Sequence, residues 1–356
     1  MRSRRTGWSA VGTALVVVTV TVSGCAGSTS ATATTAAVTS TSAAPPPITR
    51  ASVPVTIQGG QGTRGGARPM VEVRVGTSAP VPLLLDTGST GLQIFAAVVK
   101  TTAGSGVQVG TQPDRITYAG GHRLTGVVAT AKIAIGSQVT AAPVAFGLVQ
   151  QAVCIPTKPT CPVAGDIAAA MARGFYGILG IGMNRGPNGL ASPILGMSGN
   201  LARSWSIHLS GKTGSLVLGA PPVSGSSDAV TVSLKSRGTV GTNRFWDDIV
   251  HLCVSVGLPL ACAPGIFDSG TFSVELWQAR WPHVGVYPGT SLVVAGEPVS
   301  VYLPGNPTPF WEFTSGTTRS ADTVTLRTNA IVNTGVQAFY AFTITYDEVH
   351  GAISLT

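Results

Sequence analysis

The sequence predicts an all-β protein built from two lobes, and three observations lead to this. Val, Thr, Ile and Gly dominate a chain in which only 10% of residues are charged, a composition that favours strands over helices. The 45 Gly and 24 Pro indicate frequent turns. An apolar strand ending in Asp, a hydroxyl residue, Gly and another hydroxyl residue occurs twice, at 86–89 and at 268–271, 182 residues apart. This spacing indicates an internal repeat of the size of one lobe.

The first 24 residues have the features of a lipoprotein signal peptide. Three Arg lie among the first five residues, and Trp8–Val22 is an apolar stretch too short for a confident membrane span. The stretch ends in Val22-Ser23-Gly24-Cys25, which resembles the bacterial lipobox. That resemblance implies cleavage before Cys25 and lipid attachment to it. The alternative is a secretory signal that is cleaved at another small residue, with loss of Cys25.

Residues 25–50 are predicted to be a tether, because they are rich in Ser, Thr and Ala and include a run of Pro. The first lobe is expected at 51–222 and the second at 223–356, with a break in composition at Pro221–Ser227. Short helices are expected only at 165–173 and at 274–280.

The charge of the chain excludes one class of partner. Removal of the three N-terminal Arg with the signal peptide leaves 19 of the 22 basic residues against 14 acidic ones. No block of Lys and Arg and no basic stripe with interleaved aromatics accompanies this excess, so we expect no nucleic-acid binding. A mild attraction to an anionic envelope surface is the remaining consequence.

The two repeated turns are the strongest candidate for chemistry. A single Asp-Thr-Gly is usually an ordinary turn, but two copies that each follow an apolar strand indicate a paired site. Two carboxyl groups that face each other cannot both ionise, so Asp86 and Asp268 are expected to share a proton and to activate a water against an amide carbonyl. Ser89 and Thr271 are expected to hydrogen-bond the outer oxygens of the two carboxyl groups.

At these turns the chain resembles the pepsin-like, two-lobed aspartic proteases, and similar segments follow in order from about residue 53 to the C-terminus. They are Met70–Thr77, the flap hairpin Ile116–Gly126, Ala145–Leu148, the apolar-apolar-Gly segment Gly177–Gly182, Gly214–Gly219, Ile331–Phe339 and Phe342–Asp347. The resemblance implies a pepsin-like fold with catalytic Asp86 and Asp268 in the cleft between two pseudo-twofold related β lobes.

The resemblance also assigns supporting residues. Thr87, Gly88 and Ser89, with Ser269, Gly270 and Thr271, support the two carboxyl groups. Tyr118, Gly120 and Gly121 belong to the flap that closes over substrate, and Gln93 and Phe272 line the substrate site. The chain departs from the family pattern at Gln93, where Trp is common, at Phe272, where Ser or Thr is common, and at Tyr176, where Asp is common. Gln93 is expected to donate a hydrogen bond to the Tyr118 hydroxyl in place of the Trp.

The implied function is an aspartic endopeptidase that cleaves an extended polypeptide without a metal or cofactor. We expect a monomer held by lipid on the extracytoplasmic face of a bacterial cell membrane, similar to the surface aspartic proteases of mycobacteria. An envelope or secreted protein is the expected substrate. The alternative is a catalytically weak pepsin-fold module that binds an envelope protein or glycan, because Gln93 and Phe272 depart from the family pattern.

Four cysteines remain after Cys25. Their spacing suggests two local disulfides, Cys154–Cys161 and Cys253–Cys262, as expected in an oxidising compartment. The alternative, a four-Cys zinc site, lacks paired CxxC spacing, and the five His are scattered without ligand spacing. No Gly-x-Ser-x-Gly motif occurs, which excludes that type of serine hydrolase, and Gly180–Gly186 misses the spacing of a dinucleotide-binding loop.

Overall fold

Short strands are the main secondary structure in the computed structural model, which describes residues 49–59, 66–221, 229–257, 259–316 and 322–356. The predicted signal peptide, Cys25 and nearly all of the tether lie outside these residues, as does most of the predicted break between lobes. The described residues fall within one compact unit, Pro47–Thr356. Among them there is no helix with the length and apolar character needed to cross a membrane.

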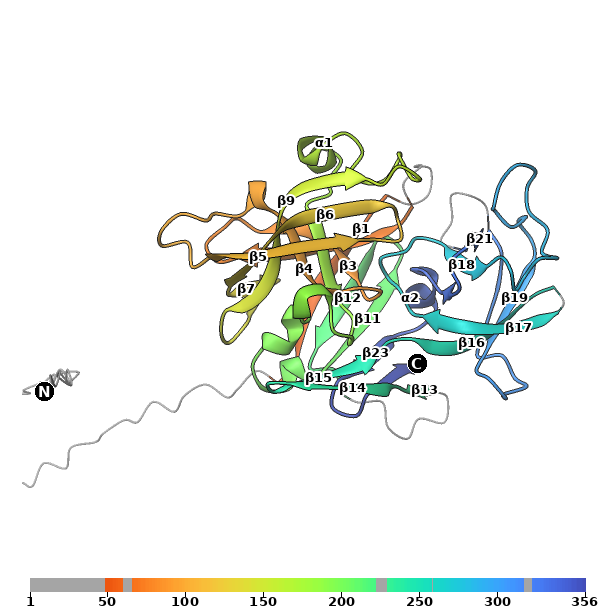
Figure 1. Ribbon diagram of the computed structural model, residues 1–356. Coiled ribbons are helices and arrows are strands. Elements are labelled where there is room, and N and C mark those ends of the chain that lie inside the picture. The colour runs from red at the N-terminus through yellow and green to blue at the C-terminus, as the bar shows by residue number, and fades with distance from the viewer. Residues whose placement is uncertain (1–48, 60–65, 222–228, 258, 317–321) are drawn as a thin grey trace, which may run out of the picture. The chain divides into compact units, whose positions relative to one another are not determined.

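The first and larger sheet has fifteen strands and runs from β13 at one edge to β5 at the other (Figure 1). Its order is β13-β24-β23-β11-β12-β1-β2-β3-β10-β4-β9-β6-β5, with β7 and β8 attached beside β2. The strands in chain order are β1 Ala51–Gln58, β2 Arg68–Val75, β3 Val81–Asp86, β4 Thr90–Phe95, β5 Gln108–Thr117, β6 His122–Ala131, β7 Ile133–Ile135, β8 Gln138–Val139, β9 Val144–Cys154, β10 Gly177–Ile181, β11 Ser204–Ser210, β12 Thr213–Leu218, β13 Val230–Ser233, β23 Ile344–Asp347 and β24 Ala352–Leu355.

The second sheet has seven strands in the order β20-β19-β16-β17-β22-β18-β21. They are β16 Val250–Val256, β17 Leu260–Ile266, β18 Val274–Trp277, β19 Pro298–Tyr302, β20 Trp311–Thr314, β21 Val324–Arg327 and β22 Val332–Asn333. A separate hairpin consists of β14 Lys235–Val240 and β15 Asn243–Asp247. The all-β, two-lobed prediction is therefore confirmed, and the last two strands of the chain return to the first sheet.

Each sheet builds the same arrangement around one of the repeated turns. Strand β10 lies between β3 and β4, parallel to the first and antiparallel to the second. In the second sheet β22 lies in the same way between β17 and β18. The turn that joins the flanking strands must therefore span the inserted strand. This arrangement places Asp86 at the end of β3 and Asp268 two residues after the end of β17.

Helices are few and short. The helix α1, Ile167–Ala172, lies within the predicted 165–173, and Asp166 caps it by accepting a hydrogen bond from the Ala169 N–H at 2.7 Å. A second helix, α2, spans Gln337–Ala341. Single 3₁₀ turns occupy Ala96–Val98, Pro187–Gly189, Pro193–Gly196 and Gly199–Ala202.

The helix expected at 274–280 was wrong, because Val274–Trp277 is the strand β18. Val274 and Leu276 are buried while the residues between and after them are not. This period of two matches a strand, and pairing with β21 in parallel register supplies the backbone hydrogen bonds.

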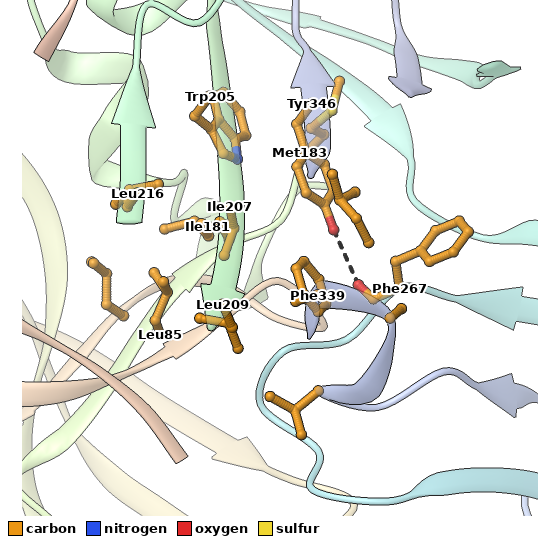
Figure 2. Close-up of a cluster of buried hydrophobic side chains, with 14 of the residues drawn as sticks. Leu85, Ile181, Met183, Trp205, Ile207, Leu209, Leu216, Phe267, Phe339 and Tyr346 are labelled. Atoms are coloured by element: carbon orange, nitrogen blue, oxygen red, sulfur yellow. Dashed lines mark hydrogen bonds between the residues drawn. The ribbon is translucent and has the colours of Figure 1, made fainter. Parts of the chain in front are cut away.

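The core passes directly beneath the repeated turns. Leu85 and Phe267, the residues before the two Asp, are both buried in one hydrophobic cluster, which Figure 2 shows together with Trp205 and Tyr346. The Tyr346 hydroxyl donates to the carbonyl of Phe267 at 3.2 Å, so its polar end is satisfied within the core. Apolar packing on both sides of the turns thus fixes the two segments that carry the carboxyl groups.

Candidate active site

The two repeated turns lie against each other, and each glycine faces the opposite carboxyl group. A Cβ on Gly88 would lie 2.6 Å from Asp268 Oδ1, and a Cβ on Gly270 would lie 2.5 Å from Asp86 Oδ1. No side chain fits at either position, which explains the Gly in both copies. Both Asp residues are buried, at 6% and 8% exposure, and each carboxyl group lies against the glycine of the opposite turn.

Each carboxyl group receives the same two donors from its own turn. The Gly88 N–H donates to Asp86 Oδ1 at 2.8 Å, and the Ser89 hydroxyl donates to Oδ2 at 2.6 Å. In the second turn the Gly270 N–H donates to Asp268 Oδ1 at 2.8 Å, and the Thr271 hydroxyl donates to Oδ2 at 2.7 Å. The inner oxygens are thereby oriented toward the opposite turn.

The second residues of the two turns tie the sheets together. The Ser269 N–H donates to Thr87 Oγ1 at 2.9 Å, and the Thr87 N–H donates to Ser269 Oγ at 3.1 Å. Each hydroxyl then donates to the carbonyl before the opposite Asp, Thr87 to Phe267 and Ser269 to Leu85, both at 2.7 Å. Both hydroxyls are buried, and each donates one hydrogen bond and accepts one. Loss of either hydroxyl therefore leaves a backbone N–H and a backbone carbonyl without their partners.

One further donor reaches only the second carboxyl group. The Asn333 side-chain amide donates to Asp268 Oδ2 at 2.6 Å, and its Oδ1 accepts from the Gly335 N–H at 2.8 Å. Sequence reasoning did not single out Asn333. The signal was present, because Asn333-Thr334-Gly335 stands where the chain's own first copy has Ile178-Leu179-Gly180.

Burial and the neighbouring carboxyl group favour the protonated form of Asp86. Burial raises the pKa of Asp86 well above its usual range, and the charge of Asp268 raises it further. Hydrogen bonds from Ser89 and Gly88 act in the opposite direction without cancelling this effect. Two carboxyl groups this close do not both ionise readily, and these surroundings favour a proton on Asp86.

The predicted flap is a hairpin of β5 and β6, closed by the turn Tyr118–Gly121. The Gly121 N–H donates to the Tyr118 carbonyl at 2.9 Å, and the Tyr118 N–H donates to the carbonyl of His122 at 2.9 Å. Gly121 has a φ of +86°, as expected for the bulge residue of a three-residue hairpin loop. The Tyr118 ring stacks on the ring of His122, with centroids 4.6 Å apart.

Tyr118 lies close enough to the dyad to sense its charge. Burial raises the pKa of the Tyr118 hydroxyl well above its usual range, and the charges of Asp86 and Asp114 raise it further, against a hydrogen bond with Ser89. The hydroxyl is therefore a neutral donor and acceptor beside the first turn.

The expected hydrogen bond from Gln93 to Tyr118 is not formed, and that expectation was wrong. Gln93 is 1% exposed on β4, and within the described part of the chain neither polar atom of its side chain has a hydrogen-bond partner. Its amide lies beside Gly147 and Asp114, facing the inside of the first sheet. Pairing of β4 between β10 and β9 directs the side chain there. Stacking on His122 orients the Tyr118 ring instead.

Three further residues were predicted to bind substrate, namely Phe272, Gly120 and Gly121, and each lies in a different environment. Phe272, half-buried, packs against residue 66, where a Cβ on Gly66 would collide with its ring. Gly120 is exposed at the tip of the hairpin. Gly121 is buried beneath Lys158, and its carbonyl accepts from the Ile155 N–H at 2.8 Å.

A comparison with protein families decides the relationship. The model of the PE-PGRS C-terminal aspartyl peptidase-like domain matches residues 51–352. The chain belongs to this family. The match covers both repeated turns and the hairpin between them, and it places the chain with peptidase-type hydrolases. No curated protein is similar enough to the chain to count as a relative.

Both predicted disulfides are present in this family member. Cys154 and Cys161 are bonded, as are Cys253 and Cys262. The first closes a loop beside the flap hairpin, and the second joins β16 to β17, the strand that leads to Asp268. No cluster of three or more His, Cys, Asp or Glu with the geometry of a metal site occurs among the described residues.

A third buried carboxyl group supports the segment after β10. Asp248 accepts from the Met183 N–H and the Asn184 N–H, both at 3.1 Å. Burial raises the pKa of Asp248 to about 7, although the two hydrogen bonds oppose this rise. It thus joins the start of β16 to the first sheet through a group that titrates near neutral pH.

Proposed function

We propose that the chain is an aspartic endopeptidase that acts through Asp86 and Asp268. The observation that carries this is the mutual approach of the two turns, in which each glycine clears space for the opposite carboxyl group. Membership of the aspartyl peptidase-like family supports the same class of reaction.

The unequal hydrogen bonding of the two groups suggests their roles, because Asp268 accepts an additional bond from the Asn333 amide. Asp268, as the carboxylate, removes a proton from a water whose oxygen bonds to the scissile carbonyl carbon. Asp86 gives its proton to the carbonyl oxygen, which produces a tetrahedral diol. When the diol collapses, the C–N bond breaks, Asp268 delivers the proton that it took from water to the leaving nitrogen, and one diol hydroxyl returns a proton to Asp86. The scheme therefore transfers protons only among the substrate, the water and the two carboxyl groups, and it replaces the C–N bond by a C–O bond to the water oxygen.

Tyr118 supplies the closing group in this proposal. Its ring is held by His122 and its neutral hydroxyl lies near Asp86. A bound peptide would run beneath the hairpin in extended form, with backbone contacts of the kind made in strand addition. Closure would exclude water other than the reacting molecule.

Single substitutions test the dyad. Asp86→Asn or Asp268→Asn should lower peptide hydrolysis by roughly 10²–10⁴-fold or more, because either removes one half of the acid–base pair. Asp248→Asn is the matched control, since it changes a buried Asp outside the pair. Substantial turnover by a folded Asp86→Asn or Asp268→Asn protein would contradict the assignment.

The alternative function, a peptide- or glycan-binding module of the same fold, gives a different result in the unmodified chain. It predicts binding of a statine-type inhibitor or a peptide without any hydrolysis. Incubation of a peptide library with the fragment 50–356 separates the two functions, and the products also define the cleavage preference.

We further propose that lipid on Cys25 holds the protein at the outer face of a bacterial cell membrane, where it acts as a monomer on envelope or secreted proteins. The lipobox-like Val22–Cys25 and the polar tether support this. Mass spectrometry of the mature N-terminus tests it. Two or more acyl chains on Cys25 are expected, since one chain gives only marginal anchoring; an unmodified terminus beyond residue 25 would refute it.

A further inference from the structure

The two carboxyl groups differ in the number of hydrogen-bond donors that reach them from the turns and the inserted strands. Asp268 has a third donor, which Asp86 lacks. Asp86 receives hydrogen bonds from the Gly88 N–H and the Ser89 hydroxyl. Asp268 receives the equivalent two and, in addition, the amide of Asn333 at 2.6 Å. The extra donor breaks the symmetry of an otherwise duplicated site.

The register of the strands identifies the counterpart of Asn333 in the first half. Asn333 pairs with Ile266, two residues before Asp268, and Ile178 pairs with Leu84, two residues before Asp86. Ile178 is buried in an apolar cluster and offers no hydrogen-bond donor from its side chain. The asymmetry is therefore built into the sequence as Asn in one copy and Ile in the other.

The orientation of the Asn333 amide is fixed by its surroundings. Its Oδ1 accepts from the Gly335 N–H at 2.8 Å, so that the Nδ2 must point to Asp268 Oδ2. A rotated amide would place an oxygen against the carboxylate and an NH₂ group against a backbone N–H. Both of these contacts would be unfavourable, so the Asn333 side chain can only donate, and not accept, a hydrogen bond at Asp268.

We propose that Asn333 is a positioning residue that keeps Asp268 ionised and leaves the shared proton on Asp86. A donor to a carboxylate favours its charged form, and a hydrogen bond to an ionised group is stronger than one between neutral groups. This inference rests on the proposed function, because it assigns Asp268 as the base and Asp86 as the acid for the first step.

The pH dependence of hydrolysis tests the proposal. Asn333→Leu removes the donor and supplies an apolar side chain, as at Ile178. Because the donor favours the charged form of Asp268, its loss should move the acid limb of kcat/KM to higher pH by about one unit, a tenfold loss of activity on that limb. Activity at the pH optimum should change much less. A purely structural role would lower activity at all pH values without moving the limb.

A second variant covers a folding failure of the first. Asn333→Asp retains the bond from the Gly335 N–H but replaces the donor by a third carboxyl group. Repulsion between like charges should then move the acid limb of kcat/KM to a higher pH than Asn333→Leu does. An acid limb that stays at the wild-type pH in either folded variant overturns the proposal.

A direct titration separates this inference from the proposed function. Aspartate carboxyl carbons labelled with ¹³C can be followed by NMR, with Asp86→Asn and Asp268→Asn used for assignment. The titration step of the pair that occurs at lower pH should move to higher pH by about one unit in Asn333→Leu. If the wild type hydrolyses no peptide, the proposed function fails while this shift still decides the role of Asn333; an unchanged titration refutes that role.

Discussion

Thr87 and Ser269 exchange backbone and hydroxyl hydrogen bonds across 182 residues of sequence, at 2.9 and 3.1 Å. This reciprocal contact joins the strand ends that carry the two carboxyl groups. Four buried hydrogen bonds from these two small residues restrict movement of one turn against the other. The relationship explains why the second residue of each copy is a hydroxyl residue.

Thr87→Ala should lower the free energy of unfolding by about 1–3 kcal/mol, because it leaves buried backbone groups of both turns without partners. Ser269→Ala should cost a similar amount, and the double variant less than the sum of the two. Urea denaturation of the three proteins measures this. Thr87→Ser, which keeps the hydroxyl, is the control and should recover most of the loss. Strict additivity would show that the two residues act independently.

Tyr118→Ala should lower turnover by roughly 10²-fold, the scale of a misplaced group near the reacting centre. Tyr118→Phe retains the stack on His122 and should lose less. Gln93→Leu should leave turnover within about threefold, because the Gln93 amide does not contact the Tyr118 hydroxyl. Steady-state hydrolysis by each variant, with thermal melts as the folding control, provides the comparison. A loss in Gln93→Leu equal to that in Tyr118→Ala would mean that the two residues act together after all.

The flap hairpin is held from outside by the Cys154–Cys161 loop. Lys158 Nζ donates to the Ala119 carbonyl at 2.6 Å, and the Ile155 N–H donates to the carbonyl of Gly121 at 2.8 Å. Strand β9 also pairs with β6 as far as Cys154 opposite His122. A two-stranded hairpin is marginally stable alone, so this third strand and loop should hold Tyr118 in place.

Replacement of Cys154 and Cys161 by Ser should therefore speed hydrogen exchange at the Tyr118 and Gly121 amides by about tenfold or more. The matched control replaces Cys253 and Cys262, which close a loop of similar length, with a separation of 9 residues against 7. Both pairs should lower overall stability by similar amounts. Equal exchange rates at the hairpin in the two variants would contradict the role of the first loop.

Stability should depend on pH through Asp248. Burial raises its pKa to about 7 in the folded chain against an ordinary value of 3.8, so the folded state binds the proton more tightly than the unfolded chain. Its contribution is complete below about pH 4 and is lost as pH rises through about 7. Relative to Asp248→Asn, the wild type should lose up to roughly 4 kcal/mol over this range, the upper bound for about three pKa units. Denaturation of both proteins at pH 4, 6 and 8 tests this, and a constant difference would show an unperturbed carboxyl group.

The sequence alone determined the fold class and the duplicated turns, because strand propensity, Gly spacing and the repeated Asp motif are local properties of the chain. The two disulfides could be predicted from the spacing of the cysteines, and the flap hairpin from its resemblance to the pepsin-like proteases. Each pairs residues that are close in sequence. The strand at Val274–Trp277 was missed, since its partner β21 lies about 50 residues away and overrides the local pattern.

Only the tertiary structure decided which polar groups meet. Asn333 reaches Asp268 across 65 residues, Asp248 reaches the Met183 N–H across a further 65, and Tyr118 finds His122 rather than Gln93. No local pattern fixes such contacts, because they depend on the register of strands and on which face each side chain occupies. The two repeated turns by themselves present two equivalent carboxyl groups. Only the pairing of β22 with β17 shows that the Asn333 amide lies beside Asp268, whereas Ile178 occupies the corresponding position in the first copy.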